Sequence, residues 1–121
     1  MNLETMPAHL RDLAIREIGC IIAMRLDLGK IPCEKHHLLT TGLHGNGERR
    51  GERYTIGLNT WSHQGNPLPG WSRSLCREVL GPSYAREPVA FREAFGADDL
   101  LLGYQDRLIR DWASNFVIRP W

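Results

Sequence analysis

The sequence predicts a small α+β protein, and three features of the chain predict this class. Apolar residues recur at helical spacing over residues 9–27 and again over 98–113. Between them lie two short stretches, 33–40 and 53–61, that predict a pair of strands. The length of 121 residues is typical of one domain. We therefore expect a single domain over residues 1–121.

The composition permits a folded core and excludes a strong overall attraction to nucleic acid. Apolar residues make up 42% of the chain and charged residues 24%, which is ordinary for a globular protein. The net charge is +1. Any contact with nucleic acid must therefore come from a local basic patch.

The composition also predicts a cytoplasmic protein without a membrane partner. No apolar run approaches the roughly 18 residues of a membrane-spanning helix. The N-terminal segment carries acidic residues and no continuous apolar core, unlike a secretory signal. Cys20, Cys33 and Cys76 are an odd number of cysteines without framework spacing, so we expect reduced thiols.

The first predicted element is an amphipathic helix over residues 9–27. Pro7 stands near its start, where the fixed backbone angle of proline suits the first helical turn. Gly29, Lys30 and Pro32 end it. The residues near helical spacing are Leu10, Leu13, Ala14, Ile18, Ile21, Ile22 and Leu26.

A hairpin follows. The stretch "CEKHHLLT" at 33–40 is short, with its apolar residues after the histidines, and predicts the first strand. Residues 41–52 contain four glycines and predict a loop. The β-rich stretch "RYTIGLNTW" at 53–61 predicts the partner strand.

Three helices are predicted after the hairpin. Ser72 can cap a short helix over 73–80. Pro88 begins another over 88–95. The last helix, 98–113, has two aspartates in its first turn, where the helix dipole favours acids. Its predicted apolar face comprises Leu101, Tyr104, Leu108 and Trp112.

Four of the five histidines fall in the hairpin region: His36, His37, His44 and His63. Imidazole is the commonest neutral ligand of divalent transition metals. Adjacent strand residues point to opposite faces, so His36 and His37 are expected to differ in role. One division is that one binds metal while the other takes a proton from water. The alternative is a buried strand without catalysis. His44, beside glycines, is expected to be solvent-exposed.

Several stretches together resemble a known family. The pattern "HHLL" followed by "WSHQG" resembles the HNH endonuclease superfamily. More specifically, "CEKHHLL", "YTIGLNTWSHQG", "LGPSYAREPVAFREAFG" and "LLGYQDRLI" resemble the phage recombination-enhancement, RecA-dependent (Ref-like) nucleases. The resemblance covers roughly residues 18–110. It implies a ββα-metal core over 33–80, packed against the N-terminal helix and the C-terminal helices at 88–113.

The resemblance also implies a site and a chemistry. His36 and His63 would bind a divalent metal (Mg²⁺, Mn²⁺ or a transition ion), and His37 would be the general base that activates water. The reaction would be hydrolysis of phosphodiester bonds in DNA. A recombinase is the protein partner that the family suggests. The location would be the host cytoplasm if a phage encodes the chain.

The chain departs from the family pattern at several positions. Tyr54 stands near the middle Asn or His position of the motif. Asn59 and Ser62 stand where some HNH proteins carry the thiolates of a structural zinc, so no four-thiolate zinc site is expected. Arg86 lies where some Ref-like members have a further histidine. Packing of the helices is expected to hold the core instead.

Arginines supply the candidate contacts to nucleic acid. Arg49, Arg50 and Arg53 lie on the loop, where guanidinium groups could hold phosphates in a bidentate way. Because Glu48 and Glu52 alternate with them, a solvated and self-paired loop is an equal alternative. Arg86 belongs to a second group of candidates, with Arg73 and Arg77.

Two functions therefore follow from the sequence. The first is a phage-type metal-dependent DNA endonuclease acting in recombination, which His36, His37 and His63 favour. The alternative is a catalytically degenerate HNH scaffold that binds nucleic acid or inhibits another protein, which Tyr54, Arg86 and the missing cysteines favour. Trp61 and Trp71 are expected to be core or loop anchors, and Cys33 and Cys76 structural thiols.

Overall fold

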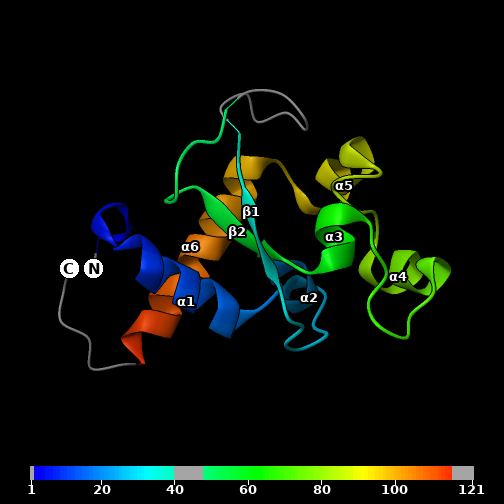
Figure 1. Ribbon diagram of the computed structural model, residues 1–121, viewed down its shortest axis with the longest axis horizontal. Coiled ribbons are helices and arrows are strands. Elements are labelled where there is room, and N and C mark those ends of the chain that lie inside the picture. The colour runs from blue at the N-terminus through cyan, green and yellow to red at the C-terminus, as the bar shows by residue number, and fades with distance from the viewer. Residues whose placement is uncertain (1, 40–47, 116–121) are drawn as a thin grey trace.

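The computed structural model describes residues 2–39 and 48–115. It confirms the α+β class, with helices around a two-stranded antiparallel sheet (Figure 1). The elements are η1 (Leu3–Thr5), α1 (Ala8–Ile18), α2 (Ile21–Arg25), β1 (Glu34–His37), β2 (Thr55–Leu58), α3 (Thr60–Gln64), α4 (Arg73–Leu80), α5 (Pro88–Phe95) and α6 (Asp98–Ser114). Within the described residues, no helix is long and apolar enough to cross a membrane.

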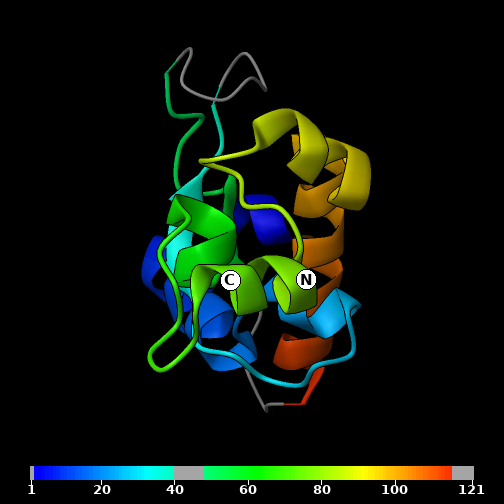
Figure 2. The same cartoon turned by 90° about the vertical axis from the view of Figure 1, so that its right-hand side faces the viewer.

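The hairpin lies between two groups of helices. In Figure 1, α3, α4 and α5 gather on one side of the sheet, while α1 packs from the other. Helix α6 lies behind the sheet in that view, and the turned view of Figure 2 places it beside the sheet, opposite α3. The sheet therefore lies between α3, α4 and α5 on one side and the helices from the two ends of the chain, α1 and α6, on the other.

The two strands pair as predicted but are shorter than the predicted stretches. Glu34 pairs with Leu58 and His37 with Thr55, so the regular ladder covers four residues on each strand. Beyond it, the Leu38 N–H donates to the Tyr54 carbonyl at 2.9 Å. The loop predicted over 41–52 is described only from residue 48, so His44 lies outside the described residues.

The single helix predicted over 9–27 is wrong, because the chain breaks between α1 and α2. Gly19 ends α1 with φ of 86°, and the Cys20 N–H donates to the Ile31 carbonyl at 2.8 Å. A Cβ on Gly19 would lie 2.7 Å from that same carbonyl oxygen. Residues 20–23 that follow are fully buried on every side. The helical periodicity continued across the break because apolar residues recur in both helices, not because the two form one helix.

The last helix, α6, buries a different face from the predicted one. Of the predicted residues Leu101 is buried, whereas Tyr104, Leu108 and Trp112 are only half-buried. The remaining buried residues are Asp98, Leu102, Gln105, Asp106, Ile109 and Ala113. Three of these are polar, so an apolar period could not identify the face that meets the sheet.

Helices α4 and α5, on the same side of the sheet as α3, match their predicted bounds. Ser72 caps α4, and its Oγ accepts the Leu75 N–H at 3.0 Å. Pro88 occupies the first turn of α5. Trp61 is 4% exposed and its Nε1–H donates to the Gly81 carbonyl at 2.9 Å. Trp61 is therefore a core anchor, as predicted, and it fixes the segment after α4 against α3.

Candidate active site

Strand β1 presents two sets of polar side chains, one on each face. Glu34 and His36 point to the face covered by α3, and Lys35 and His37 point to the face that meets α1 and the loop. His36 is the most buried of the four, at 8% exposure. The two adjacent histidines therefore lie in different surroundings, as the strand alternation predicts.

Helix α3 carries His63 and begins directly after β2. Asn59 caps it, with its Oδ1 accepting the Ser62 N–H at 2.7 Å. The Asn59 Nδ2 donates to the Ser62 Oγ at 3.1 Å and to the Cys20 Sγ at 3.2 Å. These bonds fix the start of the helix, and Asn59 and Ser62 are fully buried structural residues. His63 lies one turn after the cap, on the helix itself.

His36 and His63 come together across the two elements. Their ring centroids lie 4.7 Å apart at an interplanar angle of 63°. The His63 Nδ1 lies 2.8 Å from the Glu34 Oε1, and the Gln64 Nε2 donates to the same oxygen at 2.7 Å. A carboxylate can only accept, so His63 donates from Nδ1, and in the neutral imidazole Nε2 then carries no hydrogen.

Tyr84 forms the wall behind His36. Its ring centroid lies 4.7 Å from that of His36 and 5.4 Å from that of Phe91. The Tyr84 N–H donates to the Ser62 carbonyl at 2.7 Å, which ties the segment between α4 and α5 to α3. Burial, with a smaller effect of Asp98, raises the pKa of Tyr84. Tyr84 is therefore a neutral phenol at neutral pH.

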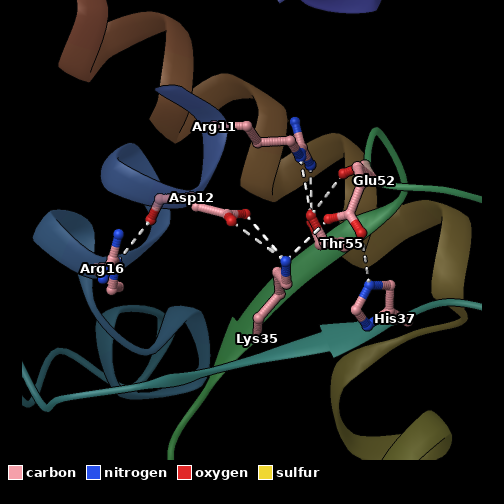
Figure 3. A network of polar contacts seen from close by, with 7 residues as sticks. All are labelled: Arg11, Asp12, Arg16, Lys35, His37, Glu52 and Thr55. Carbon is pink, nitrogen blue, oxygen red and sulfur yellow. Dashed lines mark hydrogen bonds and ion pairs between the residues drawn. The ribbon is translucent and has the colours of Figure 1, made fainter. Parts of the chain in front are cut away.

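His37 meets a charged network on the opposite face (Figure 3). Its Nε2 lies 3.3 Å from the Glu52 Oε1. Lys35 donates to the Glu52 Oε2 at 2.9 Å and to Asp12 at 3.2 Å. The hydrogen bond from Lys35, followed by that from His37, lowers the pKa of Glu52. Glu52 is therefore a carboxylate that holds His37 and is itself held through Lys35 to α1.

A cleft of about 360 Å³ brings the predicted histidines to one surface. Its lining includes His36, His37 and His63, with Arg49 and Tyr84 among the further residues. The three histidines named from the sequence thus share a cleft although His37 has its own partner. A ligand in the cleft could contact imidazoles and a guanidinium together.

The four candidate arginines do not share this cleft. Arg49 lines it, and no side-chain hydrogen bond or ion pair holds Arg49 within the described residues. Arg50 lies over the Tyr54 ring at 4.0 Å and pairs with Asp99 at 3.0 Å.

The other two arginines support the structure. Arg53 pairs with Asp106 at 2.7 Å, and the Arg86 Nε–H donates to the Gly65 carbonyl at 2.8 Å. Arg50 and Arg53 are therefore ion-paired, but with acids of α6 and not in the way that a self-paired loop predicts. Only Arg49 of the four combines the cleft with a side chain available to a ligand.

The histidine pair fits part of a metal site. With metal–nitrogen bonds of about 2.1 Å, two imidazoles on one ion have ring centroids about 5 Å apart, close to the 4.7 Å between His36 and His63. Within the described residues, no group of three His, Cys, Asp or Glu side chains converges on one position. The distance between the two rings is therefore compatible with two imidazole ligands on one transition ion, the other positions being left to water or substrate.

Sequence reasoning did not identify three residues of this site: Glu34, Glu52 and Tyr84. Glu34 could have been found, since it lies two residues before His36 and must share its strand face. Glu52 and Tyr84 had no such signal. The course of the loop places Glu52 beside His37, and the path of the chain between α4 and α5 places Tyr84 beside His36. Cys33, by contrast, donates to the Ile15 carbonyl at 3.3 Å, and burial raises its pKa to about 11. It is a protonated structural thiol, as predicted.

A comparison with known protein families gives a match over most of the chain. Residues 8–110 match a family model described as "Recombination enhancement, RecA-dependent nuclease". The match includes the whole hairpin, α3 and the segment that carries Tyr84. No curated protein and no solved structure matches the chain.

Proposed function

Since the chain belongs to the family of recombination enhancement, RecA-dependent nucleases, we propose that it is a metal-dependent, HNH-type DNA endonuclease that hydrolyses phosphodiester bonds. The observation that carries this proposal is the contact of His36 with His63 in a cleft that also holds His37 and Arg49. The order of β1, β2 and α3 agrees with a ββα-metal core. The substrate is DNA, and the family description supports a functional link to the recombinase RecA.

In this proposal His36 and His63 hold the metal. His36 is buried and confined between the rings of His63 and Tyr84, and His63 is held through Glu34. When bound there, a divalent ion would stabilise negative charge on the phosphate and the leaving oxygen. Two neutral imidazoles favour Mn²⁺, Ni²⁺ or Zn²⁺ over Mg²⁺, which prefers oxygen ligands.

His37 is the proposed general base. When its Nε2–H is donated to Glu52, the Nδ1 nitrogen carries the lone pair that can take a proton from water. The resulting hydroxide attacks phosphorus, the P–O bond to the leaving strand breaks, and the leaving oxygen takes up a proton. Glu52 remains ionised and stabilises the imidazolium that forms. Arg49 would hold a phosphate oxygen at the same cleft.

Nicking of supercoiled plasmid tests this function. The wild type should nick with Mn²⁺ or Ni²⁺, and EDTA should abolish the activity. His37→Ala should lower the rate by about 10² to 10⁴ while metal binding is kept, because a general base contributes about that factor. His36→Ala should lose both metal affinity and nicking. His9→Ala is the control, since His9 lies on the exposed side of α1 far along the chain from β1.

A degenerate scaffold is the second candidate, because no three-donor metal group is present within the described residues. On this alternative the wild type binds DNA and nicks it with none of Mg²⁺, Mn²⁺, Ni²⁺ and Zn²⁺. Normal nicking by both His36→Ala and His37→Ala would instead exclude the HNH mechanism at this cleft.

A further inference from the structure

We propose that Glu34 is a positioning residue that orients His63, so that Nε2 is the metal-binding nitrogen of this ring. The inference rests on the proposed function, since it concerns the same metal site. It assigns a role to a residue that the sequence analysis left without one. Glu34 itself remains outside the set of metal ligands in this proposal.

The first argument is the hydrogen bond between the two side chains. The Glu34 Oε1 lies 2.8 Å from the His63 Nδ1. An imidazole has two nitrogens, and the one that donates a hydrogen bond to a carboxylate cannot bind a metal. The hydrogen bond therefore selects one tautomer and turns Nε2 away from Glu34. Carboxylate–histidine pairs of this kind raise the basicity of the ligating nitrogen and fix its direction.

The second argument is that α3 is already fixed at both ends, which leaves the ring rotation of His63 to Glu34. Asn59 caps the start of the five-residue helix. Gly65 ends it in the left-handed region at φ of 75°, and its carbonyl accepts from the Arg86 Nε–H at 2.8 Å. The backbone position of His63 thus does not depend on Glu34. The direction of its imidazole is set by the hydrogen bond to Glu34, together with the ring contact to His36.

The opposing explanation is that Glu34 merely ties β1 to α3. Gln64 offers a matched control, because its Nε2 donates to the same Glu34 oxygen at 2.7 Å. Gln64 follows His63 on the same helix. A purely structural tie would be weakened by loss of either donor bond. A positioning role would depend on the bond to His63 alone.

Metal titration compares these roles. We would measure the affinity for Mn²⁺ and for Ni²⁺ by calorimetry on the wild type, Glu34→Ala, Glu34→Gln and Gln64→Ala. Glu34→Ala should bind about 10- to 100-fold more weakly, the usual effect of removing an outer partner of a metal-binding histidine. Glu34→Gln keeps an acceptor oxygen without the charge, so its metal affinity should lie between those of the wild type and Glu34→Ala. The metal affinity of Gln64→Ala should differ from that of the wild type by less than about threefold, well below the 10- to 100-fold loss expected for Glu34→Ala.

The tautomer of His63 provides a readout without metal. Nitrogen-15 chemical shifts at about pH 8, where unperturbed imidazoles are neutral, should give a protonated Nδ1 and a bare Nε2 in the wild type and in Gln64→Ala. Glu34→Ala should lose that preference. If circular dichroism shows that Glu34→Ala does not fold, the metal affinity of Glu34→Gln and the His63 tautomer in the wild type test the positioning role instead.

The outcomes separate the two proposals. If His36→Ala and His63→Ala lose affinity while Glu34→Ala binds metal like the wild type, the positioning role is overturned and the metal site stands. An Nε2-protonated His63 in the wild type also overturns it. If His36→Ala and His63→Ala bind metal normally, the proposed metal site itself fails, whatever the tautomer shows.

Discussion

Neighbouring residues in this protein can meet very different surroundings, and the loop arginines are the clearest example. Arg49 lines the cleft with the histidines, whereas the next residue, Arg50, lies on the Tyr54 ring and pairs with Asp99. One residue along the backbone therefore decides whether a guanidinium is available to a ligand. This contrast can be measured.

Arg49→Ala should weaken DNA binding for all sequences alike and lower the salt slope of log K by about 0.9, because one phosphate contact is lost. Arg50→Ala is the matched control and should leave the slope unchanged, since its charge is already paired with Asp99. The measurement is DNA affinity by fluorescence anisotropy over a range of salt concentrations. Equal slopes in the wild type and Arg49→Ala would remove Arg49 from the DNA interface.

Asp98, in the first turn of α6, is a second residue whose surroundings decide its behaviour. It is 4% exposed, and neither carboxylate oxygen has a hydrogen bond within the described residues. Burial raises its pKa, and this effect outweighs the opposing charge of Arg92. The folded state therefore binds the Asp98 proton more tightly than the unfolded chain does. Its contribution to stability is present below the ordinary pKa of aspartate, about 3.9, and is lost as pH rises through the folded pKa.

Asp98→Asn should consequently be stabilised relative to the wild type at pH 7, with the difference shrinking towards pH 3. Asp99→Asn, in the same turn but exposed, should change stability by no more than about 1 kcal/mol, the value of a surface ion pair. Urea unfolding at several pH values measures both. A gain for Asp98→Asn that is constant with pH would contradict the assignment to this carboxyl.

At the scale of elements, the break between α1 and α2 depends on one backbone position. Gly19 has φ of 86°, and an added Cβ would meet the Ile31 carbonyl oxygen at 2.7 Å. Gly29 has a similar φ of 80°, but nothing lies within 4 Å of its Cβ position. Alanine at position 29 would therefore introduce backbone strain alone, whereas alanine at position 19 would add a steric overlap to the strain.

Gly29→Ala should cost about 1 kcal/mol of unfolding free energy through strain alone. Gly19→Ala should cost about 3 kcal/mol or more, because the overlap with a backbone atom cannot be relieved by turning a side chain. Chemical denaturation of both variants checks this. Equal losses would mean that the chain near Ile31 shifts freely, and that the break does not depend on Gly19.

The elements also show what periodicity can and cannot predict. Helices 73–80 and 88–95 were predicted with the right bounds because Ser72, Pro88 and the glycines that follow them mark the ends locally. The helix over 9–27 was wrong because the reason for the break, a contact between Gly19 and Ile31, lies outside the pattern. A helix cap can be predicted from the residues next to it, whereas a close contact between distant parts of the backbone cannot.

The same distinction applies to the candidate site. The family resemblance predicted that His36 and His63 meet, and strand alternation separated His36 from His37. Arg53 and Arg86 could not be assigned from sequence, because their partners, Asp106 and the Gly65 carbonyl, come from distant segments. The roles of the histidines in binding metal and moving protons stay predictions.

At the scale of the whole molecule, one buried ionic group joins both ends of the described chain to the hairpin. Arg11 of α1 pairs with Asp106 of α6 at 3.1 Å and donates to the Thr55 carbonyl of β2 at 2.7 Å. Arg53 pairs with the same Asp106. Figure 3 shows Arg11 reaching across to Thr55. Burial lowers the pKa of Arg11, and Asp106 opposes that shift.

Asp106→Ala should lower the free energy of unfolding by about 3 to 5 kcal/mol, since it leaves a buried guanidinium without its counter-charge. Asp111→Ala, on an exposed turn of the same helix, is the matched control and should change stability by less than about 0.5 kcal/mol. Thermal and urea unfolding measure both. A loss below about 1 kcal/mol for Asp106→Ala would mean that the group adds little to stability.

The link between Arg11 and Asp106 also bears on when the cleft can form during synthesis. The two residues are 95 positions apart, and the hairpin between them is made on the ribosome well before α6. A two-stranded hairpin alone is marginally stable in water, and contacts so distant in sequence form late and slow folding. A nascent chain would therefore carry the histidines without holding them in place. We expect the cleft to be assembled only after α6 has left the ribosome, so that the proposed nicking activity would depend on that helix.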